Sequence, residues 1–164
     1  MHLRIGYYIM RGFSMVVKIV YSATAELEIT TLKSKLSDPA LSAAASECLQ
    51  SIGTILHHLR VNPYYIPPEF NPHRLWRGFC GFLWVYLEPS KHADGQNAHR
   101  MVYRVMSADN GFIGIDDPRF DYIRDRAGDL SGVDYVVHVW VGCYDYHGNQ
   151  KSKTRSAIKD TFVG

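Results

Sequence analysis

Arginine, histidine and tyrosine residues stand at the ends of β-like apolar runs in the second half of the chain. One run begins at Arg100, and the last is followed by Tyr144, Asp145, Tyr146 and His147. RNA is cleaved without a metal when a base takes the 2′-hydroxyl proton, an acid protonates the leaving oxygen and cations stabilise the phosphorane. Arginine suits the cationic task because its planar fork donates two hydrogen bonds to phosphate. Since histidine and tyrosine can transfer protons, these residues are candidates for phosphodiester chemistry.

Two arginines of the run that begins at Arg100 share one face if the run is a strand. Arg104 follows Arg100 by four residues, and side chains alternate between the faces of a strand. We predict that Arg100 clamps a phosphate; the alternative is a solvated charge at the strand end. Arg104 either lines the same groove or pairs with an aspartate of the segment 108–133.

The run before it, Phe82–Leu87, carries no charged residue, but Trp84 and Tyr86 alternate onto one of its faces. Aromatic rings can stack on nucleic-acid bases, and each stack contributes on the order of 1–3 kcal/mol. Trp84 and Tyr86 are therefore candidate RNA-binding residues. The alternative is that both belong to the core or to a surface that binds a partner protein.

The rest of the pattern predicts the elements that hold these residues. Runs of β-branched and aromatic residues predict four strands, at 16–21, 80–87, 100–107 and 134–142. Apolar residues recur at helical spacing over 24–61, which predicts a hairpin of two helices. The polar connection between the second and third strands has no helical period, so we expect those strands to be antiparallel. The predicted fold is α+β, with the helical hairpin packed on a four-stranded antiparallel sheet.

Capping residues indicate where the two helices begin and end. Ser22 or Thr24 is suited to cap the first helix, because a hydroxyl oxygen accepts a hydrogen bond from a free backbone N–H. Asp38 and Pro39 are predicted to begin the second helix, since proline is tolerated in a first turn. Pro63 ends it, because the residue before a proline avoids the helical conformation.

The composition is that of one globular domain. The chain has 164 residues, of which 46% are hydrophobic and 21% charged. We divide it into an N-terminal extension, 1–15, and a single domain, 16–164. No apolar run approaches the roughly 20 residues of a membrane span. The three cysteines, Cys48, Cys80 and Cys143, lack the spacing of a metal site, so we expect reduced thiols and no metal or cofactor.

The formal net charge of +2 conceals an uneven distribution along the chain. Residues 1–107 contain 11 lysines and arginines against 7 aspartates and glutamates. Residues 108–133 contain six aspartates and only three arginines. The sequence therefore predicts a mildly basic body with an acidic insertion between its last two strands.

Three motifs carry a resemblance to a known family. They are Leu75-Trp76-Arg77-Gly78, the run from His99 to Val105, and the run from Val136 to Gly142. Together they resemble the "RG … YRVVYRV … VVxVG" pattern of the RelE/ParE superfamily of toxins of type II toxin–antitoxin systems. The predicted order of strand, two helices and three strands is also that of the family. The resemblance spans roughly 16–147.

The resemblance implies roles for individual residues. An arginine at the place of Arg100 contacts the scissile phosphate in the family, and the arginine matching Arg77 sits near the groove, often with a structural role. Asp145-Tyr146-His147 is similar to the Asp-Tyr-His end of some ribosome-dependent members. On that likeness His147 or Tyr146 transfers the proton and Asp145 orients it.

Two departures from the family pattern affect the RNA-binding residues. Cys143-Tyr144 occupies the place where many members carry a basic residue and an arginine. Tyr144 is a candidate RNA-binding residue at this place. The best-known mRNA-cleaving members also place lysines on the strand that matches 80–87, and this chain has none there.

The function implied is that of a ribosome-dependent mRNA endonuclease that inhibits translation in the cytoplasm. Its partners are a cognate antitoxin, the ribosome and mRNA, with no membrane, metal or small-molecule cofactor. One alternative is a ParE-like toxin that poisons DNA gyrase by binding, which the missing lysines favour. Another is an inactive RelE-like binding protein, which the acidic insertion favours because negative charge opposes RNA binding.

Overall fold

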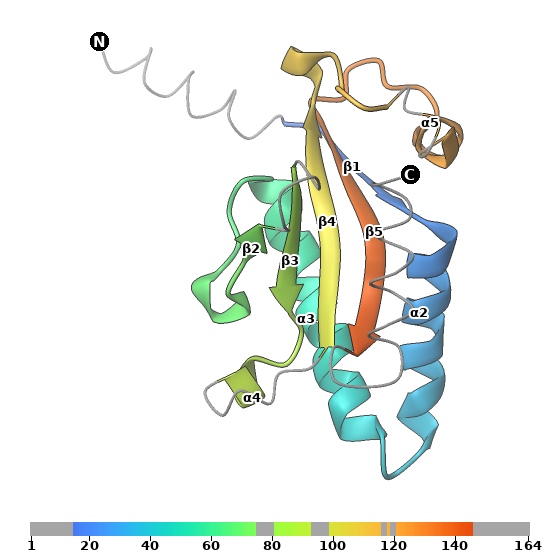
Figure 1. Cartoon of the computed structure of the whole chain (residues 1–164), viewed down its shortest axis with the longest axis vertical. Coiled ribbons are helices and arrows are strands. Elements are labelled where there is room, and N and C mark those ends of the chain that lie inside the picture. Colours follow the sequence, from blue (N-terminus) through green and yellow to red (C-terminus); the bar gives the residue numbers. More distant parts are fainter. Residues whose placement is uncertain (1–14, 75–80, 93–98, 116–117, 119–120, 146–164) are drawn as a thin grey trace.

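The computed structural model describes residues 15–74, 81–92, 99–115, 118 and 121–145. Of the predicted extension 1–15, only Met15 lies within these residues. The architecture is α+β, and the strands form one mixed sheet in the order β1-β5-β4-β3-β2 (Figure 1). The strands are β1 (Val17–Tyr21), β2 (His73–Arg74), β3 (Phe82–Tyr86), β4 (His99–Ser107) and β5 (Tyr135–Asp145). The helices are α2 (Ala23–Ser34), α3 (Ser42–Val61), α4 (Pro89–His92) and α5 (Asp121–Ala127), with 3₁₀ turns at Lys35–Ser37, Pro68–Phe70 and Ala108–Asn110.

The predicted helical hairpin is confirmed, with one difference at its turn. Ser22 caps α2, since its hydroxyl accepts a hydrogen bond of 2.9 Å from the Ala25 N–H. Asp38 does not cap the second helix. Its carboxylate accepts from the Ala40 N–H at 2.9 Å, which forms a turn, and α3 begins only at Ser42. None of the helices among the described residues has the length and hydropathy needed to cross a membrane.

The prediction of an antiparallel sheet is wrong for one pair of strands. β1 runs parallel to β5, with Val17 opposite Tyr135, whereas the β5–β4, β4–β3 and β3–β2 pairs are antiparallel. Short connections constrain only strands that follow one another along the chain. β1 is joined to the rest of the sheet through two helices, so no turn of the chain sets its direction.

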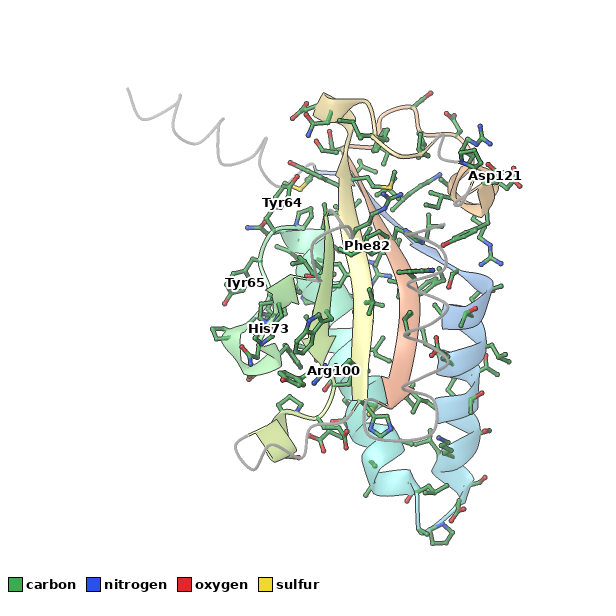
Figure 2. All side chains as sticks on the ribbon, in the orientation of Figure 1. Tyr64, Tyr65, His73, Phe82, Arg100 and Asp121 are labelled. Carbon is green, nitrogen blue, oxygen red and sulfur yellow. The ribbon has the colours of Figure 1, made fainter. Side chains whose placement is uncertain are left out.

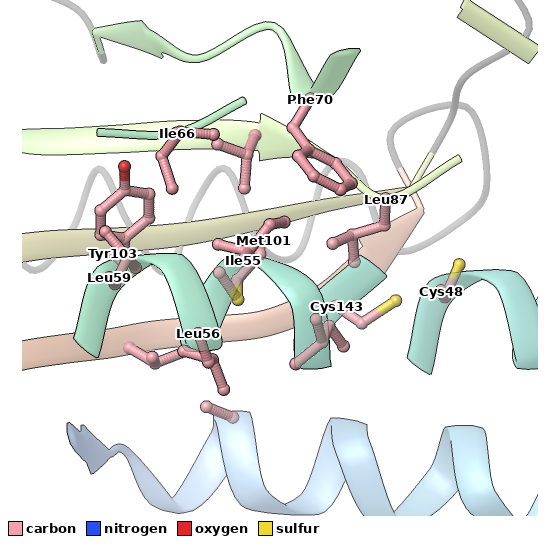
Figure 3. Packing of buried hydrophobic residues seen from close by; sticks show 14 of the residues in the cluster. Cys48, Ile55, Leu56, Leu59, Ile66, Phe70, Leu87, Met101, Tyr103 and Cys143 are labelled. Atoms are coloured by element: carbon pink, nitrogen blue, oxygen red, sulfur yellow. The ribbon is translucent and has the colours of Figure 1, made fainter. Parts of the chain in front are cut away.

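The hairpin of α2 and α3 covers one face of the sheet and encloses the larger core. Figure 1 looks onto the opposite face, with α3 behind the sheet. Ile55 and Leu59 of α3 pack on Met101 and Tyr103 of β4, and all four side chains are almost fully buried (Figure 3). Gly142 lets β5 approach α2, because a Cβ atom there would lie 2.7 Å from the carbonyl oxygen of Ala25.

The acidic segment between β4 and β5 covers part of the other face. It contains the short helix α5, Asp121–Ala127. Ile123 of α5 is buried in a second core with Phe82, Val102 and Val136 of the sheet. The Lys18 ammonium on β1 donates to the carbonyl oxygens of Ala127 and Asp129, so the segment is also held to the edge strand.

Candidate functional site

Arg100 lies on the face of the sheet that α2 and α3 leave uncovered, beside two aromatic rings of β3. Its guanidinium carbon is 4.1 Å from the centroid of the Trp84 ring and 5.2 Å from that of the Tyr86 ring. The strand register explains these contacts, since Arg100 is directly opposite Tyr86 in the antiparallel β3–β4 pair. Cations over aromatic faces are attracted by the ring quadrupole, so the two rings hold the guanidinium in place.

His73 completes this arrangement from the short edge strand β2. It is opposite Trp84 in the β2–β3 pair and stacks on the Trp84 ring, with centroids 4.3 Å apart and planes inclined by 14°. We call His73, Trp84, Tyr86 and Arg100 the platform. Trp84, Tyr86 and Arg100 are half-buried and His73 is exposed. Figure 2 shows His73 and Arg100 near one end of the sheet and Asp121 of the acidic segment near the other.

Arg104 lies on the same face as Arg100 but in a different environment. It is 9% exposed, its guanidinium carbon is 5.1 Å from the Phe82 ring, and Nη2 donates to the Gly114 carbonyl at 3.4 Å. Gly114 approaches the guanidinium so closely that a Cβ there would be 2.9 Å from Nη1. Arg104 is therefore packed between the sheet and the acidic segment.

The platform combines the two features of surfaces that bind single-stranded nucleic acid. The Trp84 ring is covered by His73 and by Arg100, so it holds the guanidinium, which can donate two hydrogen bonds to a phosphate, and the Tyr86 ring lies beside it. Comparisons with protein-family models, with curated proteins and with solved structures each find no match to this chain.

The remaining predicted residues lie at or beyond the limits of the described chain. β5 ends at Asp145, and in its register Tyr144 is opposite Arg100 and Asp145 opposite His99. The backbone of Tyr144 and Asp145 thus lies next to β4, the strand that carries Arg100. Arg77, Tyr146 and His147 lie outside the described residues.

A buried histidine under the acidic segment escaped the sequence prediction. His138 of β5 is fully buried, and its Nε2 lies 2.7 Å from the hydroxyl of Tyr122 on α5, which anchors the helix to the sheet. Burial and the nearby charge of Arg104 lower the pKa of His138 to about 3. The side chain is thus neutral at pH 7. Alternation of side chains cannot show which residue contacts His138, because Tyr122 is brought to it only by the packing of α5 on the sheet.

The low pKa of His138 predicts that the protein loses stability in acid. The imidazole takes up a proton near its ordinary pKa of 6.5 when the chain is unfolded, but only near 3 when it is folded. The free energy of unfolding should therefore fall as the pH drops from 6.5 toward 3, by up to about 1.4 kcal/mol per pH unit from this group. Urea titrations across this pH range measure the slope.

The variant His138→Gln should flatten that slope, whereas His57→Gln, which changes an exposed side chain of α3, should leave it as in the parent. An equal slope in the parent and in His138→Gln would show that His138 does not control the acid sensitivity.

Among the described residues, one group of side chains has the donor types and spacing of metal ligands. It consists of Cys48, Glu88 and His99. His99 is on the same face of β4 as Met101 and Tyr103, which belong to the core under α3, so the group is on the opposite face from the platform.

Proposed function

We propose that this protein is a RelE-like toxin that cleaves mRNA on the ribosome and so inhibits translation. The observation that carries the proposal is Arg100, held against Trp84 and Tyr86 on a sheet face that the helical hairpin does not cover. An RNA strand is bound by cations that contact its phosphates and by aromatic side chains that contact its bases, and this site has both residue types. The order of strand, two helices and three longer strands also agrees with the family that the sequence motifs resemble.

In this proposal each side chain has one task. Arg100 stabilises the charge on the scissile phosphate, Trp84 holds the guanidinium against the RNA, and the Tyr86 ring stacks on a neighbouring base. His147 or Tyr146 transfers the proton, and Asp145 orients it. Because β5 brings Tyr144 opposite Arg100, the residues that follow Asp145 start beside the clamp.

Three further residues have supporting roles in the proposal. Arg77 and Tyr144 contact the RNA. Arg104, which packs under the acidic segment, fixes that segment on the sheet, since its guanidinium already donates to the Gly114 carbonyl.

A toxin of this kind needs a protein that restrains it. We propose that a cognate antitoxin lays an amphipathic or extended segment over the platform, because half-buried aromatic rings beside an arginine suit such a partner. The reaction takes place in the cytoplasm, where the ribosome and mRNA are the other partners. It uses the 2′-hydroxyl of the RNA and requires no metal or small-molecule cofactor.

A ParE-like toxin that poisons DNA gyrase is the second candidate. The observation in its favour is the composition of β3, which reads Phe-Leu-Trp-Val-Tyr and brings no lysine to the platform. A protein that acts by binding alone needs fewer cations than one that stabilises a phosphorane. A third candidate, an inactive relative, is favoured by the aspartates of the 108–133 segment.

In vitro translation separates the three candidates. The purified protein is added to a translating extract, and the reporter mRNA is examined by primer extension. We expect new cleavage sites within translated codons and none in the same RNA incubated without ribosomes. Intact mRNA together with inhibition of supercoiling by purified gyrase would instead identify a gyrase poison. Intact mRNA and normal supercoiling would leave only the inactive relative.

A further inference from the structure

Three potential metal ligands from three elements meet on the helix side of the sheet. Cys48 comes from the middle of α3, Glu88 from the residues just after β3, and His99 from the start of β4. The sulfur, carboxylate oxygen and ring nitrogen all lie within 4.8 Å of one another. The Leu87 N–H donates to the His99 carbonyl at 3.0 Å, which brings the two strand ends together. Cys48 and Glu88 are fully buried.

We propose that Cys48, Glu88 and His99 form a zinc-binding site. Thiolate, imidazole and carboxylate are the donors that Zn²⁺ takes in proteins, whereas Mg²⁺ and Ca²⁺ prefer sites made of oxygen alone. The charges also balance, because one thiolate and one carboxylate neutralise the divalent ion. A closed site with this set therefore buries no net charge, which would otherwise be costly.

The distance between Glu88 and His99 shows how the two side chains must shift when an ion binds. Glu88 Oε1 and His99 Nδ1 lie 2.5 Å apart, so a proton is held between them. Two ligands of one tetrahedral zinc lie about 3.3 Å apart, since each bond is about 2.0–2.1 Å long. Binding must therefore replace the proton and separate the two groups by just under 1 Å. His99, whose side chain is 23% exposed, is the one of the three proposed ligands that is not fully buried.

Cys143 of β5 supports the site by favouring the thiolate form of Cys48. A hydrogen bond from the Cys143 thiol, with help from the charge of His99, lowers the pKa of Cys48. The same hydrogen bond, together with burial, raises the pKa of Cys143, so Cys48 is the first of the two to lose its proton. Figure 3 shows the two cysteines at the same end of the core. The fourth zinc position then falls to water, because the Cys143 thiol keeps its proton.

Titration of the reduced, metal-free full-length chain with Co²⁺ alone tests the site. Co²⁺ reports a thiolate ligand by a charge-transfer absorption in the near ultraviolet. We expect one equivalent to bind with this absorption, and Zn²⁺ to displace it. Cys48→Ala should abolish the absorption, and Glu88→Gln and His99→Asn should each weaken binding at least about 10-fold. Cys143→Ala and His57→Gln should retain the absorption, since neither residue is among the three ligands.

Two outcomes would overturn the proposal: a parent protein without thiolate absorption, or an absorption that survives in Cys48→Ala. Thermal unfolding of the parent provides a measurement that needs no variant. Zn²⁺ at about 100-fold above its dissociation constant should raise the melting temperature by about 5–10 °C, and Mg²⁺ should not. Equal melting temperatures with and without Zn²⁺ would equally rule out the site. The proposal does not depend on the proposed toxin function.

Discussion

Replacing Arg100 by alanine should reduce the rate of mRNA cleavage by about 10²–10³-fold, the typical cost of removing one donor that stabilises developing charge. The guanidinium is already held by the Trp84 and Tyr86 rings, so little rearrangement is needed when a phosphate arrives. The fold should persist, because Arg100 is half-buried at the start of β4 and not part of either core. Primer extension over a time course in a translating extract measures the rate.

Arg60→Ala is the matched control. It removes one positive charge from an exposed position of α3, in the layer behind the sheet, and should leave cleavage unchanged. Arg100→Lys should recover only part of the activity, because an ammonium keeps the charge but lacks the planar fork. Equal cleavage by Arg100→Ala and the parent, at matched soluble concentrations, would exclude Arg100 as the phosphate clamp.

The elements of the fold could be predicted because their signals are local. Ser22 caps α2, and α3 ends at Val61, just before Pro63, as the residue types require. β2 could not be predicted, since two residues carry no periodicity and the strand exists only through its pairing with β3. The parallel direction of β1 was missed for the related reason that its partner β5 is distant in sequence.

Three of the four platform residues, Trp84, Tyr86 and Arg100, were named as candidates from the sequence. Alternation correctly predicts that Trp84 and Tyr86 share one face of β3 and that Arg100 and Arg104 share one face of β4. Only the β3–β4 register shows that the two pairs lie on the same side of the sheet. Alternation fails further along, where the β4–β5 pair has irregularities between Arg100 and Val102 and between Val102 and Tyr103. Such bulges shift side chains to the other face and leave no reliable mark in a single sequence.

Contacts between distant segments were not predictable from spacing. Cys48 and Glu88 are separated by 40 residues of sequence, so the three ligands of the proposed zinc site do not form a short motif. Nothing local to His73 indicates that its ring stacks on Trp84. In both cases the pairing of helices and strands, which depends on the whole core, brings the side chains together.

The acidic segment bears on the choice between an active toxin and an inactive relative. Its helix α5 is held against β1 and β5 by Lys18 and by the Tyr122–His138 hydrogen bond. Figure 2 shows Asp121 of α5 toward the opposite end of the sheet from Arg100. Asp121 thus lies away from the platform, and the effect of an exposed charge falls with distance because salt screens it. The position of α5 thus favours an active toxin.

His147→Gln should suppress mRNA cleavage by about 10²–10⁴-fold, the usual contribution of general acid–base catalysis, while ribosome binding stays nearly intact. Glutamine keeps a polar side chain of similar reach but cannot exchange a proton near neutral pH. Asp145, the last described residue of β5, is the partner of His99, which adjoins Arg100, and His147 lies outside the described residues. Primer extension measures cleavage, and co-sedimentation with ribosomes measures binding.

Tyr146→Phe is the companion variant, since it removes only a hydroxyl group. If His147 carries the proton, cleavage by Tyr146→Phe should stay close to that of the parent, and the parent's rate should fall as the pH moves away from the working pKa of the imidazole. Loss of cleavage in Tyr146→Phe but not in His147→Gln would assign the proton transfer to the tyrosine. If both variants cleave like the parent, neither residue moves the proton, and catalysis depends on a group other than the two that follow β5.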